Sequence, residues 1–154
     1  MRTFRWIEDA LPVDIVALAK AALDEGYLFL ARFQDEWSNG SARFDGPGEC
    51  LFFAEVRNKL VGICAICRDP YQSDITVGRL RHVYVDRPFR SQGVAIELVN
   101  ACLAYSGKHF RVIRLSINAL NPAAAQLYEK IGFQPIILGG ERVTHQLSIN
   151  LNSG

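Results

Sequence analysis

The sequence has no marked excess of either charge and no long apolar run, and these absences exclude several classes of protein. Seventeen Lys and Arg against 16 Asp and Glu leave a formal net charge of +1 over 154 residues, whereas a nucleic-acid-binding domain usually carries a basic face. No stretch reaches the ~18–20 apolar residues of a membrane-spanning helix. Residues 1–12 contain no apolar core of a signal peptide. We therefore expect a cytoplasmic protein that binds neither nucleic acid nor a membrane.

The sequence has no cysteine pattern that is suited to metal binding or to disulfides. The four cysteines, at positions 50, 64, 67 and 102, lie in apolar surroundings, as reduced thiols in a cytoplasm do. Cys64 and Cys67 form a nominal C-x-x-C within an apolar run, 59–67, that is typical of a strand. Residues three apart in a strand point to opposite faces, and no second pair supplies further zinc ligands. We expect no metal.

Repeats, low-complexity segments and linkers are also lacking, so we expect a single domain covering residues 1–154. Hydrophobic periodicity, with turn and capping signals, predicts the order strand, two helices, three strands, helix, strand, helix, two strands. The predicted strands are residues 3–7, 50–56, 59–67, 76–86, 112–118, 133–138 and 143–151, and the predicted helices are about 11–26, 29–38, 92–106 and 121–131. This order indicates an α/β (α+β) protein with helices packed on a mixed sheet.

An R-x-x-G-x-A motif stands between a predicted strand and a predicted helix. It consists of Arg90, Gly93 and Ala95. The first N–H groups of a helix have no internal partner, and the helix dipole adds positive charge there. Gly93 can adopt dihedrals that a side chain would block, and Arg90 carries a permanent positive charge. The motif predicts an anion site, although an ordinary loop before a helix has the same pattern.

A second motif begins the last predicted helix. Its form is N-x-x-A-x-x-L-Y-x-x-x-G-F, made of Asn121, Ala124, Leu127, Tyr128, Gly132 and Phe133. Asn-Pro is typical of a helix start, and Gly132 of a helix end. Together with LRHVYVDRPFRSQGVAIELV at 80–99, this stretch resembles the GCN5-related N-acetyltransferases, the GNAT superfamily. Both parts occur in the family's order and at its spacing.

The resemblance implies a fold and an activity. The implied fold is a GNAT-like mixed, mostly antiparallel sheet of about seven strands with a central parallel pair that splays, flanked by about four helices. The implied activity is an acetyl-CoA-dependent N-acetyltransferase that moves an acetyl group to a primary amine by direct transfer in a ternary complex. The oligomeric state stays open: family members are often dimers, so a homodimer is compatible with the resemblance.

The resemblance also implies which residues hold acetyl-CoA. The backbone of the central strand would pair with the pantetheine arm as an extra strand does, and an N–H near Val83 would stabilise the oxyanion. Strand alternation predicts that Val83 and Val85 share a face with Arg79 and Arg81, and that His82 points away. The implied cofactor-binding residues are Val83, Tyr84, Val85, Arg90, Ser91, Gln92, Gly93, Val94, Ala95, Asn121 and Tyr128.

Tyr128 is the implied proton donor to the departing thiolate. A phenol has a reference pKa of ~10 against ~8.5 for a thiol, so full proton transfer would be uphill by about 2 kcal/mol. A hydrogen bond to the thiolate would suffice. Packing on an apolar helix face is the alternative for Tyr128, and helix capping is the alternative for Asn121.

The general base is the point at which the sequence departs from the family. Many members carry a glutamate on the central strand, and here that position falls near Arg79, with Arg81 beside it. Neither arginine can serve as a base. Glu55 on an earlier strand and His82 are the candidate bases, and His145 on a late strand is a weaker one. A solvated strand residue is the alternative for Glu55, and a structural or surface role is favoured for His82.

The acceptor stays open at this point. In the family, its pocket comes from the early helices and late strands, here residues 25–50 and 138–146. Asp35 and Glu36 would attract a cationic amine, whereas Arg79 and Arg81 would favour an acceptor that bears a carboxylate. A small amine, an amino acid, an aminoglycoside and a protein amine are all compatible with the sequence.

Two other functions compete with this one. The absence of the strand glutamate motivates a non-catalytic regulatory module of the same fold that binds acyl-CoA. A nucleotide-binding α/β protein of another kind would also place an anion at the R-x-x-G-x-A motif.

Overall fold

The computed structural model describes residues 1–118, 121–139 and 142–149, and it confirms the predicted order of elements. The elements are β1 (Arg2–Arg5), α1 (Ile15–Asp24), α2 (Phe29–Asn39), β2 (Cys50–Val56), β3 (Lys59–Arg68), β4 (Val77–Val85), a 3-10 turn (Arg87–Phe89), α3 (Val94–Ser106), β5 (Val112–Asn118), α4 (Pro122–Ile131), β6 (Gln134–Gly139) and β7 (Arg142–Ser148). The first strand ends two residues earlier than predicted. Ile7 is 74% exposed, because the chain has left the sheet edge before it. Positions 150 and 151 of the last predicted strand lie outside the described residues.

The seven strands form one sheet in the order β1-β2-β3-β4-β5-β7-β6. Among the described residues, every neighbouring pair is antiparallel except β4 and β5, which are parallel. The predicted mixed, mostly antiparallel sheet with a central parallel pair is therefore confirmed.

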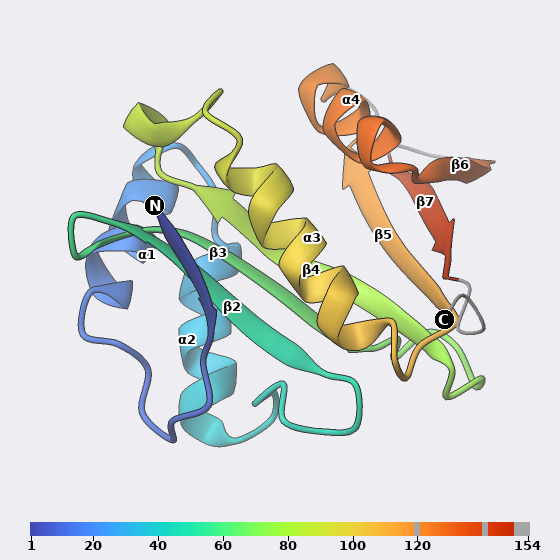
Figure 1. Cartoon of the computed structure of the whole chain (residues 1–154), viewed down its shortest axis with the longest axis horizontal. Helices are drawn as coiled ribbons and strands as arrows, with labels where there is room; N and C mark the ends of the chain where they lie inside the picture. Colours follow the sequence, from blue (N-terminus) through green and yellow to red (C-terminus); the bar gives the residue numbers. More distant parts are fainter. Residues whose placement is uncertain (119–120, 140–141, 150–154) are drawn as a thin grey trace.

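Helices cover both faces of the sheet (Figure 1). α1 and α2 pack on one face, and α3 and α4 pack on the other. Each pair of helices covers one layer of buried side chains. β3 is covered on both faces and is buried from Leu60 to Cys67, which explains its continuous apolar run. Cys64 belongs to the α3 layer and Cys67 to the α1–α2 layer, so the two thiols lie on opposite faces as predicted.

β4 and β5 separate soon after they begin. They pair only where Val77–Arg79 lie beside Val112–Arg114, and Figure 1 shows them diverging beyond this point. From Leu80 to Val85, β4 is paired with β3 on one side and with no described strand on the other. The predicted splay is confirmed, and it leaves the edge of a central strand open.

A β-bulge interrupts β4 within this open stretch. His82 and Val83 together stand opposite the single residue Cys64, and His82 has a φ of 60°. A bulge places one extra residue in a strand and shifts the alternation of side chains beyond it.

The bulge overturns one prediction about β4. Arg81 and His82 both face α2, whereas Val83 and Val85 pack in the α3 layer. Val83 and Val85 therefore do not share a face with Arg79 and Arg81, and that prediction is wrong. His82 does point away from Val83, as expected.

Candidate functional site

The loop after β4 turns the chain into α3 through two residues in the left-handed region. Ser91 has a φ of 62° and Gly93 a φ of 84°. A Cβ atom built on Gly93 would have no heavy atom within 4 Å. Glycine therefore suits this position because of its backbone conformation, which costs other residues about 1–2 kcal/mol, while the space beside it is open.

Unpaired backbone N–H groups gather at this corner. The residues from Gln92 to Ile96 have no hydrogen-bond acceptor for their N–H groups among the described residues, and the first helical bond of this turn joins the Glu97 N–H to the Gly93 carbonyl at 3.0 Å. No side chain caps the helix. Adjacent free N–H groups at a helix N-terminus form a ready anion site, as the motif predicts.

Arg90 is held by contacts with the end of β4 and with Glu25, which follows α1. Its Nε donates to the Val85 carbonyl at 2.9 Å, and its Nη2 donates to Glu25 Oε2 at 2.6 Å. The Tyr84 hydroxyl donates to the same Glu25 oxygen at 2.6 Å. The pKa of Glu25 is lowered, mainly by the hydrogen bond from Arg90 and then by that from Tyr84. Arg90 thus braces the loop against the end of α1.

Sequence reasoning missed Glu25. It is 65 positions from Arg90 and belongs to no motif. A direct contact of Arg90 with phosphate stays a prediction, and it would require the guanidinium to leave this carboxylate or to share it.

α4 begins and ends as its motif predicts. The Asn121 side chain accepts a hydrogen bond from the Ala124 N–H at 3.1 Å, which confirms the helix cap, and Gly132 ends the helix. A contact of Asn121 with the cofactor arm stays a prediction.

Tyr128 lies in the α3 layer, 7% exposed, with its ring 5.8 Å from that of Phe133. Burial raises its pKa well above the usual value, and the nearby Cys64 thiol adds to the rise. The hydroxyl is therefore protonated at neutral pH. Since Cys64 stands opposite the bulge, Tyr128 is positioned on the α3 face near the open stretch of β4.

The candidate bases Glu55 and His145 lie apart from this constellation. Glu55 is on β2 and accepts from Arg2 Nε at 2.9 Å; β3 separates its strand from β4. His145 on β7 is 2% exposed, with Nε2 4.0 Å from Glu129 Oε1. No described contact joins either residue to Tyr128, so their role as a base stays a prediction.

His82 sits among aromatic rings on the α2 face. Its ring centroid is 5.2 Å from that of Phe33 and 5.7 Å from that of Phe44. Burial, followed by the charge of Arg81, lowers its pKa to about 3. A neutral imidazole in this setting supports the structural role favoured for His82.

The two arginines of β4 have different surroundings. Arg79 donates to Ser116 Oγ at 2.6 Å, lies 3.5 Å from Asp69 Oδ2 and covers the Tyr71 ring at 4.8 Å. It joins β4 to β5 at the point where they part. Arg81, the next residue on this face, reaches towards α2.

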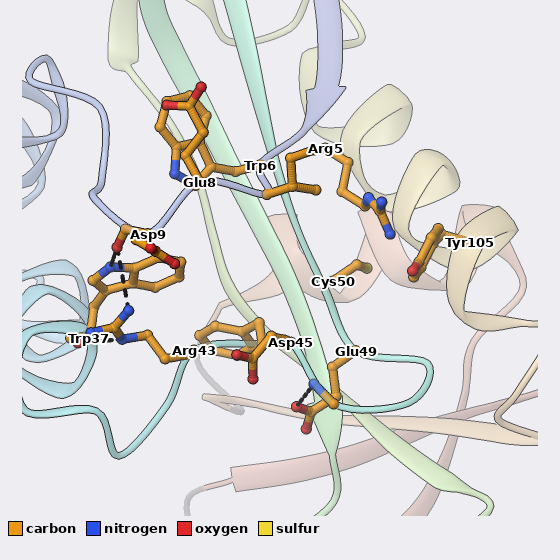
Figure 2. A pocket seen from close by; sticks show the side chains of 13 residues that line it. Arg5, Trp6, Glu8, Asp9, Trp37, Arg43, Asp45, Glu49, Cys50 and Tyr105 are labelled. Carbon is orange, nitrogen blue, oxygen red and sulfur yellow. Dashed lines mark hydrogen bonds between the residues drawn. The ribbon is translucent and has the colours of Figure 1, made fainter.

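A separate pocket of about 220 Å³ lies between the end of β1, the loop before β2 and the end of α3 (Figure 2). Its lining includes Arg5, Asp9, Trp37 and Tyr105. Tyr105 is near the C-terminal end of α3, whose 13 residues span about 20 Å. The pocket shares no residue with the loop at the opposite end of α3, and we assign it no part in the candidate site.

Neither a metal cluster nor a membrane-spanning helix occurs in the described part of the chain. No three His, Cys, Asp or Glu side chains there are grouped so as to hold a metal ion. No helix among the same residues has the length and apolar character needed to span a membrane. The cytoplasmic location and the single domain stay predictions, and the oligomeric state stays open.

Comparisons with known proteins agree with this arrangement. A family model described as acetyltransferase (GNAT) domain matches residues 47–135, more than half of the chain. An uncharacterized N-acetyltransferase of Methanocaldococcus jannaschii is 31% identical over 88 residues, 54% of this chain and 38% of that protein. The human N-acetylaspartate synthetase is 35% identical over 89 residues, 57% of this chain and 28% of that protein. These matches span about a third of the relatives' lengths.

Solved structures match over nearly the whole chain. The ribosomal-protein-alanine N-acetyltransferase of Brucella melitensis superposes with a TM-score of 0.74 over 96% of this chain and 99% of that one, at 19% identity. At this identity, the match supports the fold alone.

Proposed function

Because the chain belongs to the GNAT acetyltransferase family, we propose that it transfers an acetyl group from acetyl-CoA to a primary amine, directly and within a ternary complex. One observation carries the proposal: the free N–H groups from Gln92 to Ile96 adjoin the strand whose edge is open from Leu80 to Val85. An anion site beside an unpaired strand edge suits a ligand with a pyrophosphate and an amide-rich arm.

The residues present fit acetyl-CoA. The N–H groups of the loop, including Gly93, Val94 and Ala95, would receive the pyrophosphate, and the open space beside Gly93 admits it. The edge of β4 would bond the pantetheine amides as a strand would. The thioester supplies an activated acetyl group, and the Val83 N–H is the proposed oxyanion donor.

Tyr128 is the proposed donor to the leaving thiolate. Its burial raises its pKa, so complete transfer of its proton would cost more than the about 2 kcal/mol obtained from reference values. We therefore assign it a hydrogen bond to the sulfur, while the proton that finally reaches the thiolate comes from the acceptor nitrogen.

The relatives' names leave the acceptor open. One names N-acetylaspartate, a product derived from an amino acid, and another names a ribosomal-protein alanine, so the two names point to acceptors of different kinds. At this level the proposed acceptor is a primary amine, on a small molecule or on a protein.

The test is a thiol-release assay with acetyl-CoA and a broad panel of amines, run beside thermal unfolding with CoA or NAD. We expect CoA at 100 times its Kd to stabilise the fold by ~2.7 kcal/mol, NAD to have no comparable effect, and at least one amine to cause thiol release. Binding without release from any amine would favour the regulatory module. Stabilisation by NAD and not by CoA would overturn the assignment of the loop.

A further inference from the structure

Arg81 and Glu36 face each other on the side of β4 that α2 covers, and neither satisfies the other. Arg81 Nη2 is 3.8 Å from Glu36 Oε2, whereas charge-assisted hydrogen bonds are ~2.7–2.9 Å long. Glu36 Oε2 is buried and has no hydrogen-bond partner among the described residues. Each side chain as a whole is 32% exposed, so a ligand can reach the pair, and a rotation of the Glu36 carboxylate would present Oε2 to it.

The contrast with Arg79 shows that this arrangement is particular to Arg81. Arg79 already bonds Ser116 and pairs with Asp69, while no described oxygen lies within hydrogen-bonding distance of the Arg81 guanidinium. Arg81 is hydrogen-bonded to the thiol of Cys67; burial raises the pKa of this thiol to about 11, although the charge and the hydrogen bond of Arg81 act in the opposite direction. That thiol is neutral and leaves the positive charge of Arg81 available.

The backbone of both residues is held in place. Arg81 directly precedes the bulge at His82, two residues before Val83, the proposed oxyanion donor. Glu36 is in the last turn of α2, where its carbonyl accepts from the Ser41 and Ala42 N–H groups. A cation and an anion are thus presented side by side next to the open edge of β4.

We propose that Arg81 and Glu36 form the acceptor subsite, and that the acceptor is an amino acid or another amine that bears a carboxylate. Arg81 binds the carboxylate through its planar fork, and Glu36 Oε2 binds the ammonium group. The inference rests on the proposed function and names its substrate class. It also supplies, from α2, the carboxylate that the central strand lacks.

The reaction balances with these groups. The ammonium gives one proton to Glu36, and the freed nitrogen lone pair forms the bond to the thioester carbon. The C–S bond then breaks, and its electron pair leaves on sulfur. The second nitrogen proton leaves as the amide forms and reaches the thiolate, while Glu36 returns its proton to water.

The first experiment compares L-amino acids with analogues in which every carboxylate is a carboxamide. We expect the wild-type protein to prefer the acids by at least roughly 10-fold in kcat/KM. Arg81→Gln should raise KM for the acids roughly 10- to 100-fold, leave the carboxamides unchanged and so remove the preference. As a control, Arg32→Gln removes the same charge from an exposed position of α2. This variant should retain the preference for acids over carboxamides.

The second experiment concerns proton removal. Glu36→Gln should lower kcat roughly 100-fold or more with little change in the affinity for CoA. Asp14→Asn, at an exposed position before α1 whose side chain makes no capping hydrogen bond, should leave kcat unchanged. A Glu36→Gln variant with wild-type kcat would overturn the role of Glu36.

Failure of this inference is distinguishable from failure of the proposed function. The proposed subsite is wrong if the wild-type protein uses acids and carboxamides equally, or if Arg81→Gln keeps the preference for acids. In either case the proposed acetyl transfer is unaffected. No thiol release from any amine would overturn both. CoA-induced stabilisation reports whether each variant folds. If Arg81→Gln does not fold, Arg81→Lys keeps the charge without the fork, and an unchanged KM for acids in that variant contradicts the proposal.

Discussion

Replacing Gly93 with glutamate separates the proposed pyrophosphate contact from ordinary backbone strain. A side chain at a φ of 84° costs about 1–2 kcal/mol. For a protein of this size, each kcal/mol lowers Tm by roughly 2–4 °C. Nothing lies within 4 Å of the added Cβ, so no steric clash increases the cost, and the variant should fold.

The effect on CoA binding should be much larger. A carboxylate about 5 Å from a phosphate charge, at an effective dielectric constant of about 20, is repelled by about 3 kcal/mol, or roughly 100-fold in Kd. At a CoA concentration of 100 times the wild-type Kd, the wild-type protein gains ~2.7 kcal/mol, whereas a variant that binds 100-fold more weakly gains only about 0.4 kcal/mol.

Gly40 provides a matched control. It has a φ of 81°, and a Cβ atom added there would also have no heavy atom within 4 Å, but it ends α2, far in the chain from the loop. Gly40→Glu should lose similar stability and bind CoA like the wild-type protein. Calorimetric titration with CoA measures both Kd values. If Gly93→Glu bound CoA within threefold of Gly40→Glu, the pyrophosphate would not lie against these N–H groups.

Two further outcomes are expected. Tyr128→Phe should lower kcat roughly 100-fold and leave the Kd for CoA within a factor of two; an unchanged turnover in the thiol-release assay would reduce Tyr128 to packing. His82 is neutral when folded, with a pKa of about 3 against 6.5 when unfolded. Below pH 6.5 the unfolded chain therefore binds a proton that the folded chain does not, and stability is lost as pH falls from about 6.5 towards 3. His82→Asn, which tolerates the positive φ, should reduce this slope by up to about 1.4 kcal/mol per pH unit in urea unfolding; an equal slope in both proteins would contradict the burial of a neutral imidazole.

Features that depend on neighbouring residues could be predicted from the sequence. The cap at Asn121, the turn at Gly93 and the opposite faces of Cys64 and Cys67 follow from local backbone geometry. The order of strands and helices follows from hydrophobic periodicity in the same way. The similarity to a known family then predicted the parallel pair and its splay, which periodicity alone does not contain.

The bulge at His82 leaves a trace in the sequence that only the structure makes readable. Leu80, Val83 and Val85 pack in one layer, and their spacing of three and then two breaks the strict alternation of a regular strand. Because of the bulge, the side chains of Arg81 and Val83 lie on opposite faces of the sheet. The bulge therefore decides which side chains can contact an acceptor.

The sequence by itself determined the elements, their order and the N–H-rich turn before α3, because each depends on residues that are close together in the chain. Only the tertiary structure decided that Glu25 holds Arg90 and that Glu36 stands opposite Arg81. Those pairings join helices to a strand and loop far along the chain. They depend on how α1 and α2 pack on the sheet, which the buried apolar faces of these helices determine and the charged residues themselves do not.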